Sequence, residues 1–515
     1  MPVANLILAY DIGTTGNKAT LYSPEGRVVA HAFQGYPTYH PQANWAEQDA
    51  DDWWRAVCQA TQQLLVSAKV RRENIACVSF SGQMQGCLPV DAAGRPLHRC
   101  LIWADQRAVQ EAAQLESRLG MAHVYHLTGH RLSPTYSGPK IMWLRNHKPD
   151  VYAQTHRFLH VKDYVIHRLC GCFVTDCSDA SGMNLYDLHR QEWAADILAA
   201  AEIEPERLPA IHQATDVVGV VTRQAEEEIG LRAGTPVVVG GGDGACATVG
   251  AGAVRAGIAY NYLGSSSWIA YTAPAPVLDA MMRTFTFAHL MPGMFIPCGT
   301  MQTAGGAYQW LRDQVCVSEV GAAAQAGADV YEVMNEKAAE APPGAHHLLF
   351  LPYLLGERSP YWHPQARGAF VGLTVRHTRA DLIRAVLEGI SFYLKLILQA
   401  FLEAGADIRE MRVIGGGAKG MFWRQMLADV YGLPISRPRL LAEATSLGAA
   451  VAGGVGVGLL ADFTDVDRFI EIVQRHQPEP RAQMAYEHLF PVFRRAYDAL
   501  RPVFDYLYDK DNLSE

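Results

Sequence analysis

The chain has 515 residues, of which 49% are hydrophobic and 19% are charged, and its formal net charge is −8. This length predicts two large domains, each with its own core. A net negative charge without a Lys/Arg block argues against a nucleic-acid-binding surface. The first apolar run is cut by Asp11 and no apolar stretch is long enough to cross a bilayer, so neither a signal peptide nor a membrane span is expected. The ten cysteines form no CxxC pair, which favours free thiols in a reducing cytoplasm.

The stretch Leu6 to Tyr22, LILAYDIGTTGNKATLY, predicts a β-hairpin with a polar tip. Asp11 ends the first apolar run and Lys18 begins the second β-prone run. The turn between them consists of Gly13, Thr14, Thr15 and Gly16. A carboxylate, two hydroxyls, free amides and a cation are the groups that hold Mg²⁺ and polyphosphate oxygens. Taken alone, the same residues also fit an ordinary polar turn.

The next elements predict a mixed sheet covered by helices. A third strand is expected over 28–33, an amphipathic helix over 49–68 and a buried strand over 75–80. The loop 81–86, SGQMQG, follows that strand at its C-terminal end, where open α/β sheets place ligand groups. The segment 101–107, LIWADQR, suits a polyol because it combines an aromatic ring, an acid and a base, and its alternative interpretation is a surface ion pair.

Helices are also expected over 140–144 and 157–169. The segment 177–182, CSDASG, is predicted as a loop in which Asp179 caps a helix. A continuous apolar strand over 236–240 then leads into GGGDG, followed by a small-residue helix over 245–253. Asp243 thus stands at a helix N-terminus, where it fits an N-cap carboxylate. Three glycines before it exceed what a cap requires, and they allow another backbone or a ligand to approach closely.

Both features recur in the second half of the sequence. YLGSSSW, with strands over 259–263 and 268–271, echoes the first hairpin without its acid. RVIGGGAKG, with a strand over 411–414 and a helix over 421–431, echoes the glycine turn before Asp243. We infer a duplicated α/β domain whose halves face each other across a cleft. The tail after Gly453 is predicted to be helical.

Together these motifs resemble the FGGY carbohydrate kinases, which share the fold of actin, hexokinase and the heat-shock ATPases. Residues 368–388 fit the family's C-terminal pattern at every fixed position, and DIGTTGNK, GGGD, YLGSSS, AGGAYQWLRD and GGGAKG occur in the family's order. The resemblance covers nearly the whole chain. It implies an α/β fold of two RNase H-like, actin/hexokinase-type domains of mixed sheet plus helices facing across a cleft. The domains are 1–253, for sugar, Mg²⁺ and the catalytic Asp, and 254–515, for the nucleotide.

Within the family the chain is most similar to xylulokinases, notably over 351–374 and in GQMQG and IWADQR. Two positions depart from that pattern: Gln85 stands where a His is usual, and Gly244 stands where an Asn often follows the catalytic Asp. The resemblance implies ATP-dependent conversion of D-xylulose to D-xylulose 5-phosphate. It leaves open another ketose, polyol or sugar acid, namely L-xylulose, ribulose, gluconate or erythritol.

The resemblance also implies a role for each motif. Asp243 is expected to accept the proton of the sugar hydroxyl, with its pKa lowered by the helix N-terminus, and to hold Mg²⁺ together with Asp11. The residues expected to contact sugar are Met84, Gln85, Trp103, Asp105 and Asp243. Those expected to contact the phosphates of ATP are Gly13, Thr14, Thr15, Lys18, Gly264 and Ser265. Those expected to line the adenosine pocket are Gly306, Gly415, Gly416, Gly417 and Ala418.

Two other functions fit parts of the sequence. An actin-like nucleotide switch would share the fold, but such proteins lack the segment 356–360, GERSP, and the C-terminal family pattern. A dinucleotide dehydrogenase would use the glycine turns, yet neither turn gives GxGxxG with an acid about twenty residues further on. The expected partner is a small-molecule sugar, with no nucleic acid or membrane. Dimers are common among similar kinases, although no segment of the sequence locates a homodimer interface.

Overall fold

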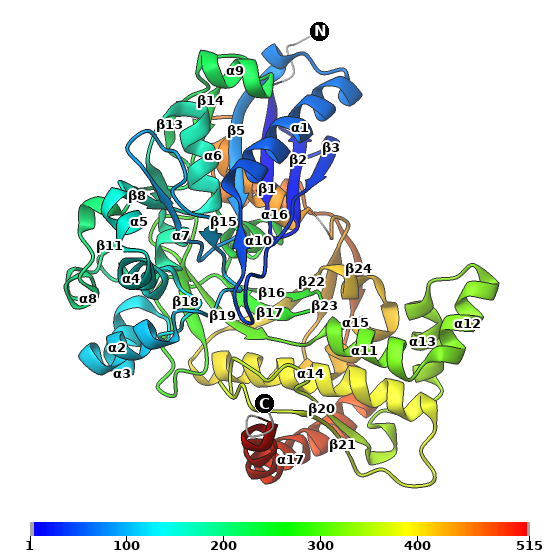
Figure 1. The fold of residues 1–515 in the computed structure, drawn as a ribbon. Helices are drawn as coiled ribbons and strands as arrows, with labels where there is room; N and C mark the ends of the chain where they lie inside the picture. Colours follow the sequence, from blue (N-terminus) through cyan, green and yellow to red (C-terminus); the bar gives the residue numbers. More distant parts are fainter. Residues whose placement is uncertain (1–4, 442, 512–515) are drawn as a thin grey trace.

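The computed structural model describes residues 5–441 and 443–511. The molecule consists of two α/β halves, one above the other in Figure 1, and each half is built on a seven-stranded mixed sheet. This agrees with the predicted two-domain α/β architecture.

The first sheet contains only strands from the first half of the chain, in the order β13-β14-β5-β1-β2-β3, with the short β15 beside β5. Strands β1, β2 and β3 form the predicted antiparallel meander, and β5 lies parallel to β1. The bounds are β1 Leu6–Ile12, β2 Gly16–Tyr22, β3 Val28–Gly35, β5 Ile75–Gly82, β13 Val217–Val220, β14 Pro236–Val238 and β15 Gly241–Gly242.

The second sheet has the order β18-β19-β17-β16-β22-β23-β24. From β19 onward it repeats the first sheet strand by strand: an antiparallel pair β17/β16, then β22 and β23 parallel to β16, then an antiparallel edge strand. The bounds are β16 Gly257–Leu263, β17 Ser267–Tyr271, β18 Phe285–Ala288, β19 Phe295–Met301, β22 Ile408–Ile414, β23 Ile435–Pro438 and β24 Ile472–His476.

This topology confirms the duplication and corrects one of its details. Because β22 lies beside β16 as β5 lies beside β1, the turn GGGAKG after β22 corresponds to the loop SGQMQG after β5. It does not correspond to the GGGD turn, which follows β14. The two glycine triplets look alike in sequence because both bring a backbone very close to a neighbouring strand.

Helices cover both sheets. α1 packs on β2 and β3 and begins after Asp49, whose side chain accepts a hydrogen bond from the Asp51 amide. The other helices of the first half are α2 Val109–Leu119, α3 Met121–Thr128, α4 Ser137–His147, α5 Pro149–Gln154, α6 Val161–Cys170, α7 Cys177–Ser181, α8 Ala195–Ala201, α9 Arg223–Ile229 and α10 Asp243–Gly250, with α1 spanning Ala50–Ala68. Those of the second half are α11 Gly305–Gln314, α12 Val317–Ala326, α13 Val330–Ala339, α14 Arg379–Glu403, α15 Met421–Tyr431, α16 Ala444–Gly456 and α17 Pro480–Asp511.

Short two-stranded ladders complete the structure. They are β4 Glu47–Gln48 with β7 Cys100–Leu101, β6 Leu88–Val90 with β8 Arg157–Leu159, β9 Val174–Asp176 with β12 Ala210–His212, β10 Tyr186–Asp187 with β11 Glu192–Trp193, and β20 Leu349–Pro352 with β21 Gly368–Val371.

Helices α10 and α16 pack against each other between the two sheets (Figure 1). Their backbones meet at glycines: a Cβ on Gly250 would lie 1.8 Å from the Ala444 carbonyl oxygen, and one on Gly448 would lie 2.0 Å from that of Cys246. Although α16 follows the second sheet in the chain, it also packs on β1 and β5. The strands of the first sheet thus end at Gly242 and those of the second begin at Gly257, whereas α16, from the C-terminal part of the chain, packs on the first sheet.

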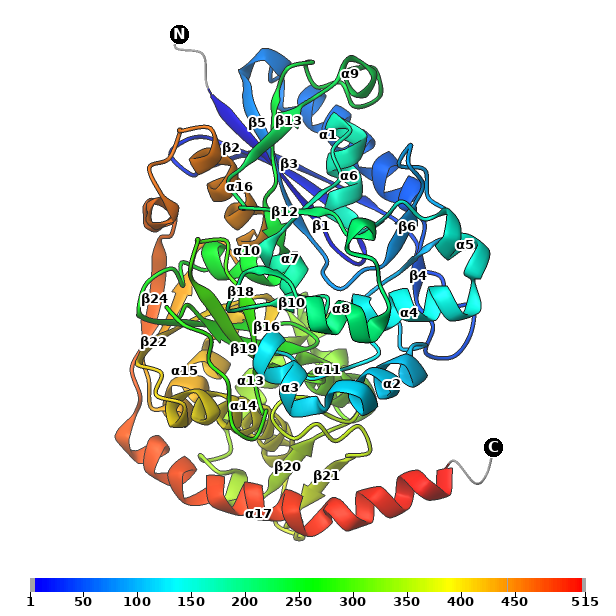
Figure 2. The same cartoon turned by 90° about the vertical axis from the view of Figure 1, so that its left-hand side faces the viewer.

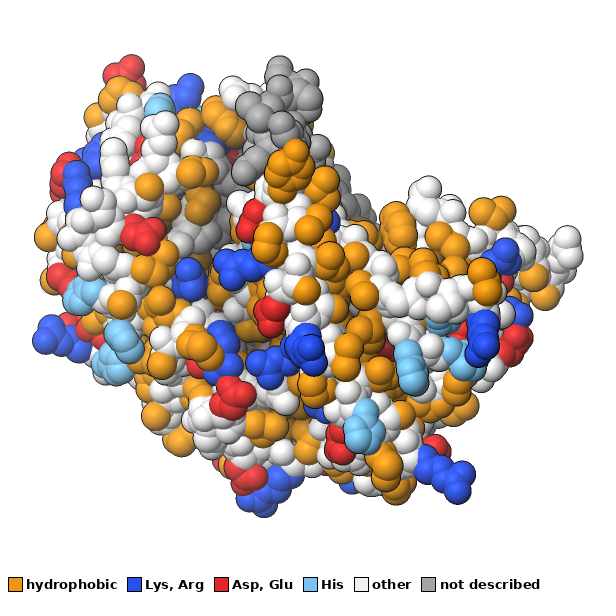
Figure 3. Space-filling view, turned by 90° about the horizontal axis from the view of Figure 1, so that it is seen from below, with side chains coloured by type: hydrophobic (Ala, Val, Ile, Leu, Met, Phe, Trp, Pro, Cys, Tyr) orange, Lys and Arg blue, Asp and Glu red, His pale blue; other side chains and the backbone are white. Residues whose placement is uncertain are grey.

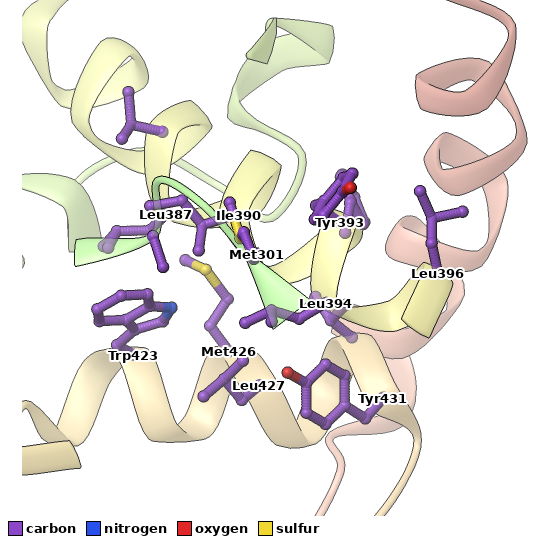
Figure 4. Packing of buried hydrophobic residues seen from close by; sticks show 14 of the residues in the cluster. Met301, Leu387, Ile390, Tyr393, Leu394, Leu396, Trp423, Met426, Leu427 and Tyr431 are labelled. Carbon is purple, nitrogen blue, oxygen red and sulfur yellow. The ribbon is translucent and has the colours of Figure 1, made fainter. Parts of the chain in front are cut away.

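The core of the second half lies around α14, which packs against α15 and the sheet (Figure 4). Leu387, Ile390 and Leu394 of α14 face Trp423, Met426 and Leu427 of α15. By length and composition α14 could cross a membrane, but 83% of its most apolar window is buried inside the protein. It is the core helix of this half. On the face seen from below, charges of both signs lie among hydrophobic side chains (Figure 3).

Three predicted elements differ in the structure. Residues 157–169 are not one helix, because 157–159 pair with β6 before α6 begins. The tail after Gly453 contains β24, which completes the second sheet before the long α17 runs along the bottom of the molecule (Figure 2). The segment 177–182 forms the short helix α7, and its N-cap is Asp176 rather than Asp179.

Candidate active site

Three segments of the chain meet at Asp11, near the tip of the first hairpin. Asp11 pairs with Lys18 across the hairpin. Its Oδ1 accepts a hydrogen bond from Ser81 Oγ at 3.3 Å, and its Oδ2 accepts one from Thr445 Oγ1 of α16 at 2.5 Å. Burial raises the pKa of Asp11, and the Thr445 hydrogen bond and the Lys18 charge oppose this only in part. The carboxylate is therefore incompletely compensated by the protein.

Asp243 begins α10, as the sequence predicts, but its pKa moves in the opposite direction to the prediction. Burial, followed by the negative charges of Asp11 and Asp179, raises the pKa of Asp243 to about 7. The amide of Gly244, which donates to Asp243 Oδ1 at 2.7 Å, and the helix N-terminus oppose this shift without reversing it. Neighbouring carboxylates and low solvation thus outweigh the helix dipole.

The glycines before Asp243 let two loops touch. Gly240 has a φ of +67°, and a Cβ there would lie 2.0 Å from the Phe80 carbonyl oxygen. Gly242 pairs with Gly82 at the end of β5, and a Cβ on Gly242 would lie 2.6 Å from Met84 Cγ. The close approach is thus to protein atoms, and it places the Met84 side chain directly against the turn before Asp243.

Gln85 lies beside Met84 with a φ of +64°. Its carbonyl oxygen accepts a hydrogen bond from Lys140 Nζ at 2.9 Å, and the same ammonium donates to the Ile102 carbonyl at 2.6 Å. Burial lowers the pKa of Lys140 to about 8. This lysine, which the sequence analysis placed only in a helix, ties the SGQMQG loop to the segment that carries Trp103.

Trp103 connects the predicted sugar and phosphate residues. Its Nε1 donates to Thr14 Oγ1 at 2.9 Å, and its side chain remains 37% exposed. The turn beside it is held from below by Gln48 Nε2, which donates to the Thr14 carbonyl at 2.7 Å. Thr15, at the outermost position of the turn, is exposed.

Asp105 does not present a free carboxylate to a ligand, in contrast to its predicted role as a sugar contact. Its side chain is 0% exposed, and that of Arg107 is 1% exposed, so this ion pair is buried rather than on the surface. Arg107 donates to both carboxylate oxygens, and the amide of Ala46 donates to Oδ2 at 2.7 Å. The acceptor sites of Asp105 are thus used in holding the Trp103 segment in place.

The residues predicted to bind ATP from the second half lie together at the C-terminal end of β16. The carbonyls of Gly264 and Ser265 accept hydrogen bonds from the amides of 304–306 at the start of α11, and the Gly306 amide donates at 2.9 Å. Gly415 has a φ of +89°, and a Cβ there would lie 2.6 Å from the Leu263 carbonyl oxygen. A Cβ on Gly417 would lie 2.9 Å from Leu263 Cβ, whereas one on Gly416 would meet no atom within 4 Å. Ala418 is buried.

The two halves touch beside Asp243, at Gly244. Tyr260 of β16 donates its hydroxyl hydrogen to the Gly244 carbonyl at 3.2 Å, and Trp268 Nε1 donates to the Tyr260 hydroxyl at 2.8 Å. Burial raises the pKa of Tyr262, and the negative charges of Asp243 and Asp11 raise it further. The acidic pair of the first half therefore faces the hairpin of the second half.

Sequence reasoning missed four contributors to this site: Thr445, Lys140, Lys162 and Ser178. Thr445 lies 434 residues from the carboxylate that it contacts, so only tertiary structure identifies it. Lys140 lies in a segment for which the sequence predicts only a helix. Lys162 packs against Gly82, and Ser178 Oγ accepts a hydrogen bond from the Gly242 amide; neither residue has a local sequence signal.

Comparisons with known proteins identify the family of the chain. Residues 6–250 match the N-terminal domain of the FGGY family of carbohydrate kinases, and residues 259–457 match its C-terminal domain. The chain is 31% identical to a gluconokinase from Bacillus licheniformis over 95% of each chain. It is 30% identical to a xylulose kinase from Escherichia coli strain K12, over 95% of this chain and 98% of that protein.

Among solved structures, a ligand-bound xylulose kinase from Lactobacillus acidophilus superposes with a TM-score of 0.91 at 28% identity. The match covers 98% of this chain and 100% of that one. The chain therefore belongs to the FGGY family of carbohydrate kinases, and it is a kinase.

Proposed function

We propose that this kinase transfers the γ-phosphoryl group of ATP to a hydroxyl of a small sugar, most closely D-xylulose, giving D-xylulose 5-phosphate. The observation that carries the proposal is the Asp243 carboxylate. It lies at the start of α10 against Met84, faces the second half, and has its pKa raised to about 7. A carboxylate of this pKa suits a general base at neutral pH.

In the proposed mechanism the attacking sugar hydroxyl gives its proton to Asp243 as the bond to phosphorus forms. Phosphoryl transfer needs in-line positioning and charge neutralisation more than covalent chemistry. Thr14, Thr15 and Lys18 of the first hairpin would contact the β- and γ-phosphates, and Gly264 and Ser265 would contact them from the second half. Gly306 and 415–418 would lie along the adenosine.

The residues present fit a bound Mg²⁺. Asp11 and Asp243 are both partly buried, and the charge of Asp11 raises the pKa of Asp243. Such a pair of carboxylates fits a divalent cation, which would stabilise the charged form of each and neutralise phosphate charge. We assign Asp11 and Asp243 as the residues that would hold it.

Met84, Gln85 and Trp103 are the proposed sugar contacts. Asp105 is omitted because its carboxylate is occupied by Arg107 and Ala46, so we assign it the support of Trp103. A Cβ on Gly244 would lie 3.8 Å from Met84 Sδ, an ordinary contact distance. Beside Met84 the site thus has room that an Asn at this position would occupy in part.

Gluconate is the second candidate substrate. Two observations favour it: a gluconokinase is as similar to the chain as the xylulose kinases are, and Gln85 replaces the His that xylulokinases usually carry. Gln85 offers both an amide donor and a carbonyl acceptor. A sugar acid would require no change in the roles of Asp243 and Asp11.

The test is ADP release with Mg-ATP in the presence of D-xylulose, gluconate, L-xylulose, D-ribulose, L-ribulose, erythritol or glycerol, with Asp243→Ala as the control. Strong stimulation by D-xylulose that Asp243→Ala lowers by roughly 10²–10⁴-fold supports the proposal. Stimulation by gluconate alone would identify gluconate as the substrate and leave the proposed mechanism unchanged. Near-normal turnover in Asp243→Ala would show that Asp243 is not the general base. If no sugar stimulates ADP release by the wild-type protein, the proposed reaction is wrong.

Cytoplasmic localisation and a homodimer remain predictions. Sedimentation velocity of the purified protein at several concentrations tests the second of these.

A further inference from the structure

A group of buried charged side chains lies behind residues 239–243, which we call the catalytic turn because the proposed mechanism makes Asp243 the base, and that mechanism does not use the group. We call His160, Lys162, Asp163, Asp176 and Asp179 the Lys162 cluster. Lys162 Nζ lies 2.6 Å from Asp163 Oδ1, 2.9 Å from Asp176 Oδ1 and 3.0 Å from Asp179 Oδ2. None of these side chains is more than 1% exposed.

The cluster lies directly under the two loops that form the sugar side of the site. A Cβ on Gly82 would lie 3.0 Å from Lys162 Cβ, so the start of the SGQMQG loop rests on the lysine stem. Gly82 in turn pairs with Gly242, the residue before Asp243. The cluster therefore supports both the Met84 loop and the catalytic turn.

A chain of hydrogen bonds joins the cluster to that turn. The Gly242 amide donates to Ser178 Oγ at 2.9 Å, and Ser178 Oγ donates to Asp176 Oδ2 at 2.5 Å. The Ser178 amide also donates to Asp176 Oδ2, at 2.7 Å. Through Ser178, the backbone next to Asp243 is thus connected to a carboxylate that Lys162 holds.

The cluster is better explained as a support than as a metal site. His160, Asp163 and Asp179 offer ligand atoms within 4.8 Å of one another. The Lys162 ammonium, however, lies within 3.0 Å of an oxygen of each of the three carboxylates. A metal ion would have to displace this buried cation. A buried ionic network of this kind is rigid, because each member loses its charge compensation when it moves.

Resting on the proposed function, we propose that Ser178 is a positioning residue for phosphoryl transfer. It fixes the Gly242 amide against the Lys162 cluster, and through that amide it fixes the position of the Asp243 carboxylate. Positioning matters in this reaction because a displacement of about 1 Å can cost roughly 10²-fold in rate. Ser178 itself contacts neither of the proposed nucleotide turns.

Ser178→Ala is expected to lower kcat for the best sugar by roughly 10–100-fold. The KM for ATP and the ATP dissociation constant measured by calorimetry are expected to stay within about twofold of wild type. The ratio of sugar-stimulated to sugar-independent ATP hydrolysis should fall with kcat. A variant that was merely less stable would instead lose active enzyme, which active-site titration detects.

Two variants provide matched controls. Thr175→Val removes a neighbouring buried hydroxyl that has no hydrogen-bond partner among the described residues, and it is expected to leave kcat unchanged. Ser178→Thr retains the hydroxyl and is expected to recover most of kcat. Near-UV circular dichroism and the thermal midpoint establish that each variant is folded. If Ser178→Ala does not fold, Ser178→Cys keeps nearly the same volume with a weaker donor and should give an intermediate kcat.

A crystal structure of Ser178→Ala adds a readout that does not depend on activity. The Gly242–Asp243 backbone is expected to move by more than about 0.5 Å, the tolerance of a preorganised site. An unmoved turn overturns the inference, as does wild-type kcat in Ser178→Ala or an equal loss in Thr175→Val. If the wild type phosphorylates a sugar and Ser178→Ala has the same kcat, only this inference is refuted. If the wild type phosphorylates no sugar, the proposed function is refuted.

Discussion

The two hairpins occupy equivalent places in their sheets, but only the first carries a charged pair near its tip. Asp11 and Lys18 form the second cross-strand pair from the turn of the first hairpin. Tyr262 and Trp268 form the equivalent pair of the second hairpin. The two rings stack with centroids 4.1 Å apart. The same backbone geometry therefore presents a carboxylate in one half and an aromatic surface in the other.

The turns beside the hairpins differ in the same way. In the first half, the loop after β5 carries Met84 and Gln85, and the turn after β14 carries Asp243. In the second half, the turn after β22 carries glycines, Ala418 and Lys419, and the turn after β23 leads to Glu443, which stands at the N-cap of α16. The two halves thus share the duplicated frame and its close backbone approaches, and they differ in side chains: Asp11 faces Lys18 in the first hairpin, and two stacked aromatic rings face each other in the second.

The largest expected effect comes from replacing the acid that distinguishes the hairpins. Asp11→Asn keeps the shape but removes the negative charge, and it should lower kcat by roughly 10²–10³-fold, the scale of a lost electrostatic contact in the transition state. Tyr262→Phe at the equivalent position should change kcat by less than about threefold. Steady-state ADP release with the best sugar measures both. Equal losses in the two variants would show that the asymmetry has no catalytic meaning.

The pH dependence sharpens the same comparison. Asp243 must be deprotonated to accept a proton, and its pKa is raised to about 7. We therefore expect kcat/KM to fall about tenfold per pH unit on the acid side of an apparent pKa near or below 7. Bound Mg²⁺ stabilises the charged form of Asp243 and so lowers this apparent pKa. Because the Asp11 charge helps to raise this pKa, the residual activity of Asp11→Asn should show an acid limb at lower pH. An unchanged limb would mean that Asp11 does not influence Asp243.

The second half can be tested through adjacent glycines. Gly415→Ala places a Cβ 2.6 Å from the Leu263 carbonyl at a φ of +89°, and it should cost roughly 1–3 kcal/mol of stability. Gly416→Ala meets no atom within 4 Å, so its thermal midpoint should equal that of wild type. If adenosine lies along this turn, Gly416→Ala should raise the KM for ATP several-fold. An unchanged KM would remove Gly416 from the nucleotide site.

The smallest expected effect is on stability. Because the folded state raises the pKa of Asp243, this group favours folding when it is protonated and loses that contribution as the pH rises through about 7. Asp243→Asn should therefore raise the Tm at pH 8 by a few degrees, and much less at pH 5, where the wild-type side chain is also neutral. Differential scanning calorimetry at the two pH values provides the measurement. A stabilisation that is independent of pH would contradict the assigned cause.

Most of the site motifs could be located from sequence because each is a local pattern. The DIGTTG and GSSS turns lie between β-prone runs, and the Met84 and Asp243 turns follow buried strands, so their positions at strand ends follow from chain order. Sequence could not decide which repeats are equivalent. The glycine triplets look alike, but strand order pairs GGGAKG with SGQMQG, because equivalence depends on which strand lies beside the hairpin.

The amino-acid sequence by itself determined the family, the two-sheet architecture and the positions of Asp11 and Asp243, because periodicity, turns and motifs are properties of neighbouring residues. Only the tertiary structure decided the electrostatics. The pKa of Asp243 depends on burial and on Asp11 and Asp179, which are distant in sequence, and these outweigh the local helix dipole. The structure likewise decided that Asp105 is occupied by Arg107, and that Thr445 reaches Asp11 across the chain. Burial and long-range contacts arise only when the two halves pack together.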